Sequence, residues 1–118
     1  MAKILVVDDS FFQRKMLSDI LVDMGYEVVS AINGEEAIEQ VDKDEFQLIC
    51  LDLLMPGLSG IEVLTHFQGK EGVPPIIVIS ADIQIKKKEQ CMALGAVAFI
   101  HKHINREEVE ENVSKFIK

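Results

Sequence analysis

Five side chains with acid, hydroxyl or amine groups each stand at the end of a short apolar run of the sequence. Asp8 and Asp9 follow the first run, Asp52 the third, Ser80 the fourth and Lys102 the fifth. An Asp-Asp pair or a lysine taken alone is typical of a solvated surface. Because the carboxyl ends of parallel strands meet at one edge of a sheet, the shared placement predicts that all five lie together.

The predicted group carries three negative charges against one positive charge. Like charges a few ångströms apart repel by several kcal/mol at an effective dielectric constant of ~20. Either one carboxyl stays protonated or a hard cation binds between the carboxylates. Mg²⁺ prefers carboxylate oxygens and waters, and it commonly bridges to phosphate. With the lysine and hydroxyl beside it, the group also suits phosphoryl transfer to an aspartate, in which positive charges neutralise the phosphoryl oxygens.

Five short apolar runs predict strands, and several of them are nearly continuous in Val, Ile and Leu without polar alternation, as strands buried on both faces are. The predicted strands span residues 4–7, 27–29, 46–51, 76–79 and 97–100.

Helix starts stand between the strands as a capping residue followed three positions later by Gln or Glu. Ser10 with Gln13 is predicted to form a capping box, and the other pairs are Asn33 with Glu36, Ser59 with Glu62, and Asn105 with Glu108. A further helix is predicted from near Asp82 to Gly95. Of the aromatic pair Phe11 and Phe12, one ring is expected to pack against the sheet and the other to be exposed. Five strands alternating with five helices predict an α/β fold, a parallel sheet in a three-layer αβα sandwich.

Length and composition limit the remaining possibilities. The chain has 118 residues, 12 basic and 20 acidic, with a formal net charge of -8 and a pI of about 4.8. This length predicts one domain, residues 1–118, and the acidic balance argues against a nucleic-acid surface. No apolar run approaches the ~18 residues that span a membrane, and no signal peptide is evident. Cys50 and Cys91 are interpreted as small buried apolar residues of a cytoplasmic protein.

Four motifs, spread over the whole length, resemble the receiver domain of two-component response regulators. They are Val6-Val7-Asp8-Asp9-Ser10, Asp52-x-x-Met55-Pro56-Gly57-x-x-Gly60, Ile79-Ser80-Ala81 and Gly95-Ala96-x-x-Phe99-x-x-Lys102. The resemblance implies a flavodoxin-like, CheY-like fold with strand order 2-1-3-4-5. It also implies a phosphoprotein that catalyses only its own phosphorylation and dephosphorylation and is not a turnover enzyme.

The same resemblance implies a role for each site residue. Asp52 accepts a phosphoryl group from a sensor histidine kinase or phosphotransfer protein. Mg²⁺ is ligated directly by Asp9, Asp52 and the backbone carbonyl of Leu54, and Asp8 holds it through water. Lys102 pairs with the phosphoryl group, while Ser80 and Phe99 form the switch. The signal then passes to a protein partner through the fourth helix, the fifth strand and the fifth helix, and the protein works as a monomer or weak dimer. Lys86, Lys87 and Lys88 on the fourth helix are either a solvated helix face or part of this output face.

The sequence departs from the family pattern after the lysine, where His103 replaces the usual proline. We expect a trans Lys102-His103 bond, because a cis bond before a residue other than proline costs ~2.5–4 kcal/mol. Two alternatives to a single-domain regulator remain open: a receiver fragment of a larger regulator, and a pseudo-receiver that binds partners without phosphorylation. An aspartate-nucleophile phosphatase and a flavin protein are disfavoured, since their motifs are missing after the first strand.

Overall fold

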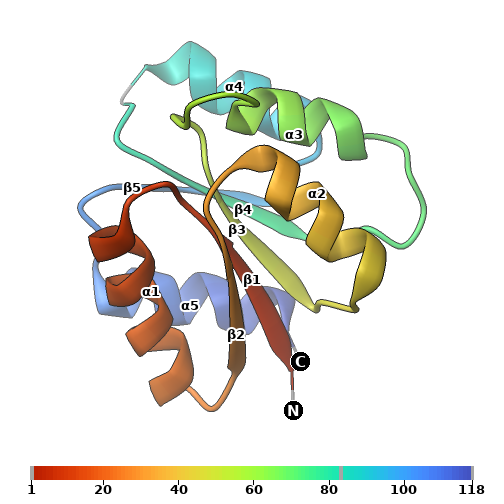
Figure 1. Cartoon of the computed structure of the whole chain (residues 1–118). Helices are drawn as coiled ribbons and strands as arrows, with labels where there is room; N and C mark the ends of the chain where they lie inside the picture. Colours follow the sequence, from red (N-terminus) through yellow and green to blue (C-terminus); the bar gives the residue numbers. More distant parts are fainter. Residues whose placement is uncertain (1, 83, 118) are drawn as a thin grey trace.

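Five parallel strands alternate with five helices in the computed structural model, which describes residues 2–82 and 84–117 (Figure 1). The strands are β1 (Lys3–Val7), β2 (Glu27–Ala31), β3 (Leu48–Asp52), β4 (Ile76–Ser80) and β5 (Ala98–His101). They form one sheet in the order β2-β1-β3-β4-β5. The predicted fold and strand order are confirmed, and strand ends differ from the predicted ones by at most two residues.

The helices cover both faces of this sheet. They are α1 (Phe11–Asp23), α2 (Gly34–Lys43), α3 (Gly60–Phe67), α4 (Ile85–Ala93) and α5 (Arg106–Phe116). Helices α1 and α5 pack on one face, and α2, α3 and α4 on the other (Figure 1). None of the helices in the described ranges combines the length and apolarity that crossing a bilayer requires.

Alternate residues of the central strands supply two separate cores. In β1, Leu5 and Val7 face the α2–α4 side, whereas Ile4 and Val6 face the α1–α5 side. All four are almost fully buried, and burying such a side chain contributes about 1.5–3 kcal/mol. A strand buried on both faces needs apolar residues at every position, which explains the uninterrupted Val, Ile and Leu runs.

The two cysteines belong to these cores as predicted. Cys50 and Cys91 are free thiols and are buried. Burial raises the pKa of the Cys50 thiol to about 12. At neutral pH this thiol is therefore protonated and serves as an apolar packing group.

The helix starts follow the predicted capping residues with one correction. Ser59 and Glu62 form a complete capping box at α3. At α1 the Ser10 hydroxyl accepts from the Gln13 N–H, but the reciprocal half of the predicted box is missing. The Ser10 N–H instead donates to the Asp8 carboxylate at 2.9 Å, so the Gln13 side chain is left to line the space beside Asp8.

Two further expectations about the helices were wrong. The predicted start of the fourth helix near Asp82 moves to Ile85, and the Asp82 carboxylate instead accepts from the N–H of Gln84, the residue just before the helix. Phe11 and Phe12 are both exposed, at 71% and 70%. The core-facing stripe of α1 runs through positions 17, 20 and 21, and at 3.6 residues per turn positions 11 and 12 fall outside it.

Candidate functional site

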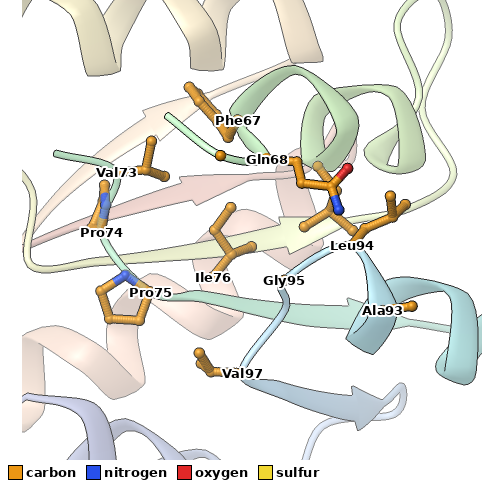
Figure 2. Close-up of a pocket in the computed structure, with 12 residues that line it drawn as sticks. Phe67, Gln68, Val73, Pro74, Pro75, Ile76, Ala93, Leu94, Gly95 and Val97 are labelled. Atoms are coloured by element: carbon orange, nitrogen blue, oxygen red, sulfur yellow. The ribbon is translucent and has the colours of Figure 1, made fainter. Parts of the chain in front are cut away.

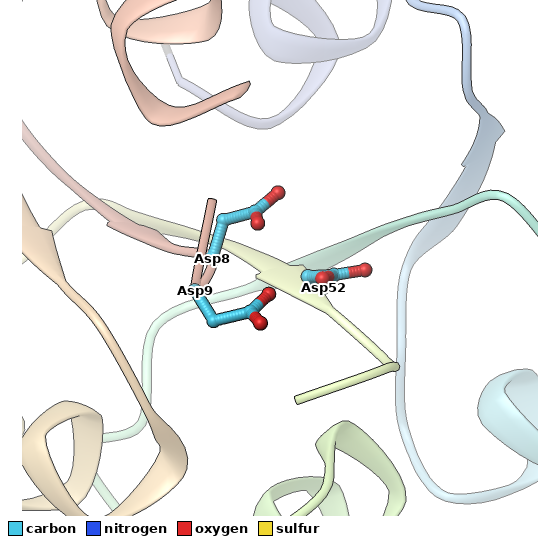
Figure 3. A group of neighbouring side chains, drawn as sticks. All are labelled: Asp8, Asp9 and Asp52. Carbon is cyan, nitrogen blue, oxygen red and sulfur yellow. The ribbon is translucent and has the colours of Figure 1, made fainter. Parts of the chain in front are cut away.

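Three carboxylates meet at the carboxyl edge of the sheet (Figure 3). Asp8 and Asp9 directly follow β1, and Asp52 is the last residue of the neighbouring strand β3. Oxygen atoms of all three lie within 4.8 Å of one another. Asp8 and Asp52 are buried, while Asp9 is exposed. The structure thus brings together the three acids that the sequence placed after separate strands.

Lys102 reaches this group from the end of β5. Its Nζ lies 2.9 Å from Asp8 Oδ2 and 3.5 Å from Asp52 Oδ1. Its backbone N–H donates to the Ser80 carbonyl at 2.9 Å, which ties the lysine to the end of β4. One cation therefore contacts two of the three carboxylates.

The bond after Lys102 corrects one prediction. The Lys102-His103 peptide is cis, so the expectation of a trans bond was wrong. That expectation considered only the preference of an isolated peptide. In the folded chain both the backbone and the side chain of Lys102 are held by contacts to distant residues, Ser80 and Asp8.

The charge balance of the site favours an added cation. Burial, then the neighbouring charge of Asp8, raises the pKa of Asp52 to about 6, although Lys102 and the Leu54 N–H lower it. Three carboxylates beside one ammonium leave the group net negative. Clustered carboxylate oxygens are the donors that Mg²⁺ prefers, so the residues present fit this ion.

The remaining predicted residues lie around the carboxylates. Ser80 is fully buried at the end of β4, and its hydroxyl accepts from the Asp82 N–H at 3.1 Å. Leu54 follows Asp52 in the next loop and is 63% exposed. Phe99 is not part of the group: it lies in β5, partly buried, with its ring centroid 5.2 Å from that of His101.

The loop between β3 and α3 is held tightly on both sides. A Cβ at Gly60 would lie 2.5 Å from the Asp52 carbonyl oxygen, and one at Gly34 would lie 2.7 Å from the Leu58 carbonyl oxygen. The Glu35 carboxylate also accepts from the Leu58 N–H at 3.3 Å. The loop that carries Leu54 is thus clamped between the starts of α2 and α3.

A family model for the response regulator receiver domain matches residues 4–114. The chain belongs to this family. Phosphorylation and Mg²⁺ dependence are general to receiver domains, which bind the ion at an acidic pocket. They act as signalling proteins that interact with histidine kinases and downstream effectors.

Individual relatives support the assignment. The receiver is 34% identical to chemotaxis protein CheY of Listeria monocytogenes, with 100% of each chain covered. It is 40% identical over 108 residues to a protein-glutamate methylesterase/protein-glutamine glutaminase of Oleidesulfovibrio alaskensis, but covers only 29% of that protein. Response regulator TrrA of Thermotoga maritima, solved with Mg²⁺ and BeF, matches with a TM-score of 0.89 and 35% identity, covering 99% of this receiver and 100% of that chain.

A separate pocket of about 330 Å³ opens at the opposite end of the sheet (Figure 2). It lies between the ends of α3 and α4, next to the first residues of β4 and β5. Phe67, Ile76 and Val97 line it, and none of its lining residues is ionisable. This pocket therefore takes no part in the carboxylate site of the receiver.

Sequence reasoning missed two residues that contact the site's backbone. Arg14 Nη1 donates to the Asp8 carbonyl oxygen at 2.8 Å, and Glu35 holds the loop after Asp52. The sequence position of Arg14 could have predicted this contact. Arg14 stands one helical turn after the capping Ser10, and helical side chains tilt toward the N-terminus. No sequence pattern predicts the Glu35 contact, because it depends on how α2 packs against a loop 23 residues away.

Replacing Gly60 with alanine is expected to lower the free energy of unfolding of the receiver by about 2 kcal/mol. The added Cβ meets backbone atoms of Asp52 and Leu53 at 2.5 and 2.6 Å, and this overlap outweighs the gain in helix propensity of about 1 kcal/mol. Urea unfolding followed by circular dichroism measures the change. Unchanged stability would show that the loop after Asp52 moves away freely.

Proposed function

We propose that the receiver accepts a phosphoryl group on Asp52, in a Mg²⁺-dependent reaction with a histidine kinase or phosphotransfer protein. The observation that carries the proposal is the position of the Asp52 carboxylate, buried at the end of β3 beside Asp8, Asp9 and the Lys102 ammonium. An aspartate whose pKa is raised by burial and by a like charge, and which lies beside a cation, is a candidate functional group.

Each residue has a separate part in this reaction. Asp9, Asp52 and the Leu54 carbonyl would ligate Mg²⁺ directly and Asp8 would hold it through water; once bound, the ion would supply positive charge to the phosphoryl oxygens. One Asp52 oxygen forms a bond to phosphorus while the phosphorus–nitrogen bond of the donor breaks. Lys102, now shared between Asp8 and Asp52, pairs with the arriving phosphoryl oxygens. The receiver itself catalyses this transfer and the later hydrolysis.

The switch begins with the charge that phosphorylation adds. A phosphoryl group brings roughly -1.5 to -2 charge and three strong acceptor oxygens. The Ser80 hydroxyl, held by the Asp82 N–H, turns to donate to the phosphoryl group. Phe99 on the adjacent strand β5 leaves its contact with His101 and turns inward. These two side chains form a small bistable element of the kind that signalling switches use.

The output passes to a protein partner through α4, β5 and α5. Lys86 and Lys88 are exposed on α4, and Lys87 is half-buried. Ile83, which could join this surface, lies outside the described residues. Residues 1–118 act as one receiver, as a monomer or weak dimer. The protein works in the cytoplasm, as is typical of the family.

Incubation with acetyl phosphate, with and without Mg²⁺, tests this function. The intact mass is expected to increase by one phosphoryl group with Mg²⁺, and to stay unchanged when a chelator removes the ion. Base treatment should reverse the increase, because an acyl phosphate hydrolyses readily. If neither phosphorylation nor beryllium fluoride binding occurs, the chain is a pseudo-receiver and the proposal is wrong. Beryllium fluoride binding without phosphorylation indicates a competent site that needs a protein donor.

A further inference from the structure

The position of Asp9 depends on its backbone. The Asp8 carboxylate contacts the Ser10 N–H and Lys102, and that of Asp52 contacts Lys102. Within residues 2–82 and 84–117, no side chain forms a hydrogen bond or ion pair with the exposed Asp9 carboxylate, although it lies beside both other acids (Figure 3). The orientation of the Asp8–Asp9 peptide therefore sets the point and direction from which this carboxylate extends.

Two contacts fix the backbone there, one on each side. The Asp8 N–H donates to the Ala31 carbonyl at 3.1 Å, and the Asp8 carbonyl accepts from Arg14 Nη1 at 2.8 Å. That carbonyl belongs to the same planar peptide as the Asp9 nitrogen, and a peptide plane moves as one unit. The Arg14 contact consequently orients the unit from which the Asp9 side chain extends.

Arg14 is itself held in place. It is half-buried, and its Cζ lies 5.9 Å from the centroid of the Phe11 ring. A guanidinium within about 6 Å of an aromatic ring is attracted to the ring face. Phe11 thus restricts an otherwise flexible side chain, which makes the exposed ring part of the support for the Asp8 carbonyl.

We propose that Arg14 is a positioning residue for the Mg²⁺ site of the receiver, acting through the Asp8–Asp9 peptide. This inference rests on the proposed function, because it concerns the ion that phosphorylation requires. Charge and positioning have opposite effects here. The Arg14 cation repels Mg²⁺, so its removal should tighten binding if charge alone mattered. Removal should weaken binding if the hydrogen bond to the Asp8 carbonyl places Asp9.

Mg²⁺ titration of the unphosphorylated chain by calorimetry separates the two effects. Arg14→Ala is expected to weaken binding about 10-fold, as loss of a partner that orients metal ligands does elsewhere. Arg14→Lys keeps the charge and a donor, and should restore part of the affinity. Lys15→Ala is the matched control: it removes a cation from the same helical turn, where Lys15 pairs only with Asp19 among the described residues. It should bind Mg²⁺ as well as wild type or slightly more tightly.

Hydrogen exchange of the Asp9 amide without Mg²⁺ provides a readout independent of the metal. Exchange should be faster in Arg14→Ala and unchanged in Lys15→Ala. One set of results would overturn this inference and leave the proposed function standing. In that case wild type binds Mg²⁺, Arg14→Ala binds it equally or more tightly, and hydrogen exchange at the Asp9 amide is unchanged. A wild-type chain that binds no Mg²⁺ would overturn the proposed function as well.

Discussion

Replacing Asp52 with asparagine is expected to reduce phosphorylation by acetyl phosphate by on the order of 10³-fold or more, as removing a nucleophile does in other covalent catalysts. Asparagine has nearly the same size, so it keeps the packing at the end of β3. It lacks the anionic oxygen that attacks phosphorus, and it is a poorer ligand for Mg²⁺. Intact-mass spectrometry over time, at saturating Mg²⁺, measures the rate in both proteins.

A surface variant and peptide mapping show whether the effect is specific to Asp52. Asp19→Asn removes one exposed carboxylate from α1 outside the site, and should be phosphorylated at the wild-type rate. Peptide mapping of the modified wild type should place the phosphoryl group on Asp52. Phosphorylation of the Asp52→Asn chain at the wild-type rate would mean that another residue, such as Asp8 or Asp9, is the acceptor.

The same substitution is expected to raise the free energy of unfolding by up to about 3 kcal/mol at pH 7.5 without Mg²⁺. The pKa of Asp52 is about 6 in the folded chain, against about 3.9 for an unfolded aspartate. Because folding raises this pKa, the folded state binds the proton more tightly, and the wild type loses stability as pH rises from about 4 to about 6. Asparagine carries no charge and avoids this loss.

Urea unfolding with a chelator at two pH values measures the gain. The difference in free energy of unfolding between Asp52→Asn and wild type should narrow to about 1 kcal/mol at pH 4.5, because Asp52 is then largely protonated in the folded chain. Adding Mg²⁺ at pH 7.5 should also narrow it, since the ion binds the folded wild type preferentially. A variant less stable than wild type at pH 7.5 would show that the contact with Lys102 outweighs burial and the charge of Asp8.

Periodicity and strand ends were enough to predict the carboxylate group. Asp8, Asp9 and Asp52 follow runs that are buried on both faces, and a parallel sheet has only one carboxyl edge on which they can meet. The capping pairs Asn33 with Glu36 and Ser59 with Glu62 likewise mark true helix starts, because a capping contact involves residues only three positions apart.

What the sequence could not predict depends on contacts between distant segments. The Gln13 half of the predicted capping box is lost because the Asp8 carboxylate takes the Ser10 N–H. The Lys102-His103 bond, the Arg14 contact and the Glu35 clamp all depend on how loops pack across the sheet edge. The roles of Leu54 and Phe99 rest on the family resemblance and stay predictions.

The contact between Lys102 and Asp8 joins residues 94 positions apart, and it carries a consequence for synthesis of the protein. Lys102 directly follows β5, which lies at the edge of the sheet and pairs with β4. Contacts between such distant residues form late, because a long loop must close before they are gained. A nascent chain in which β5 has not yet emerged therefore has its acids together without the lysine. Under the proposed function, such a chain gains the ability to accept a phosphoryl group only when β5 is made and packs against β4.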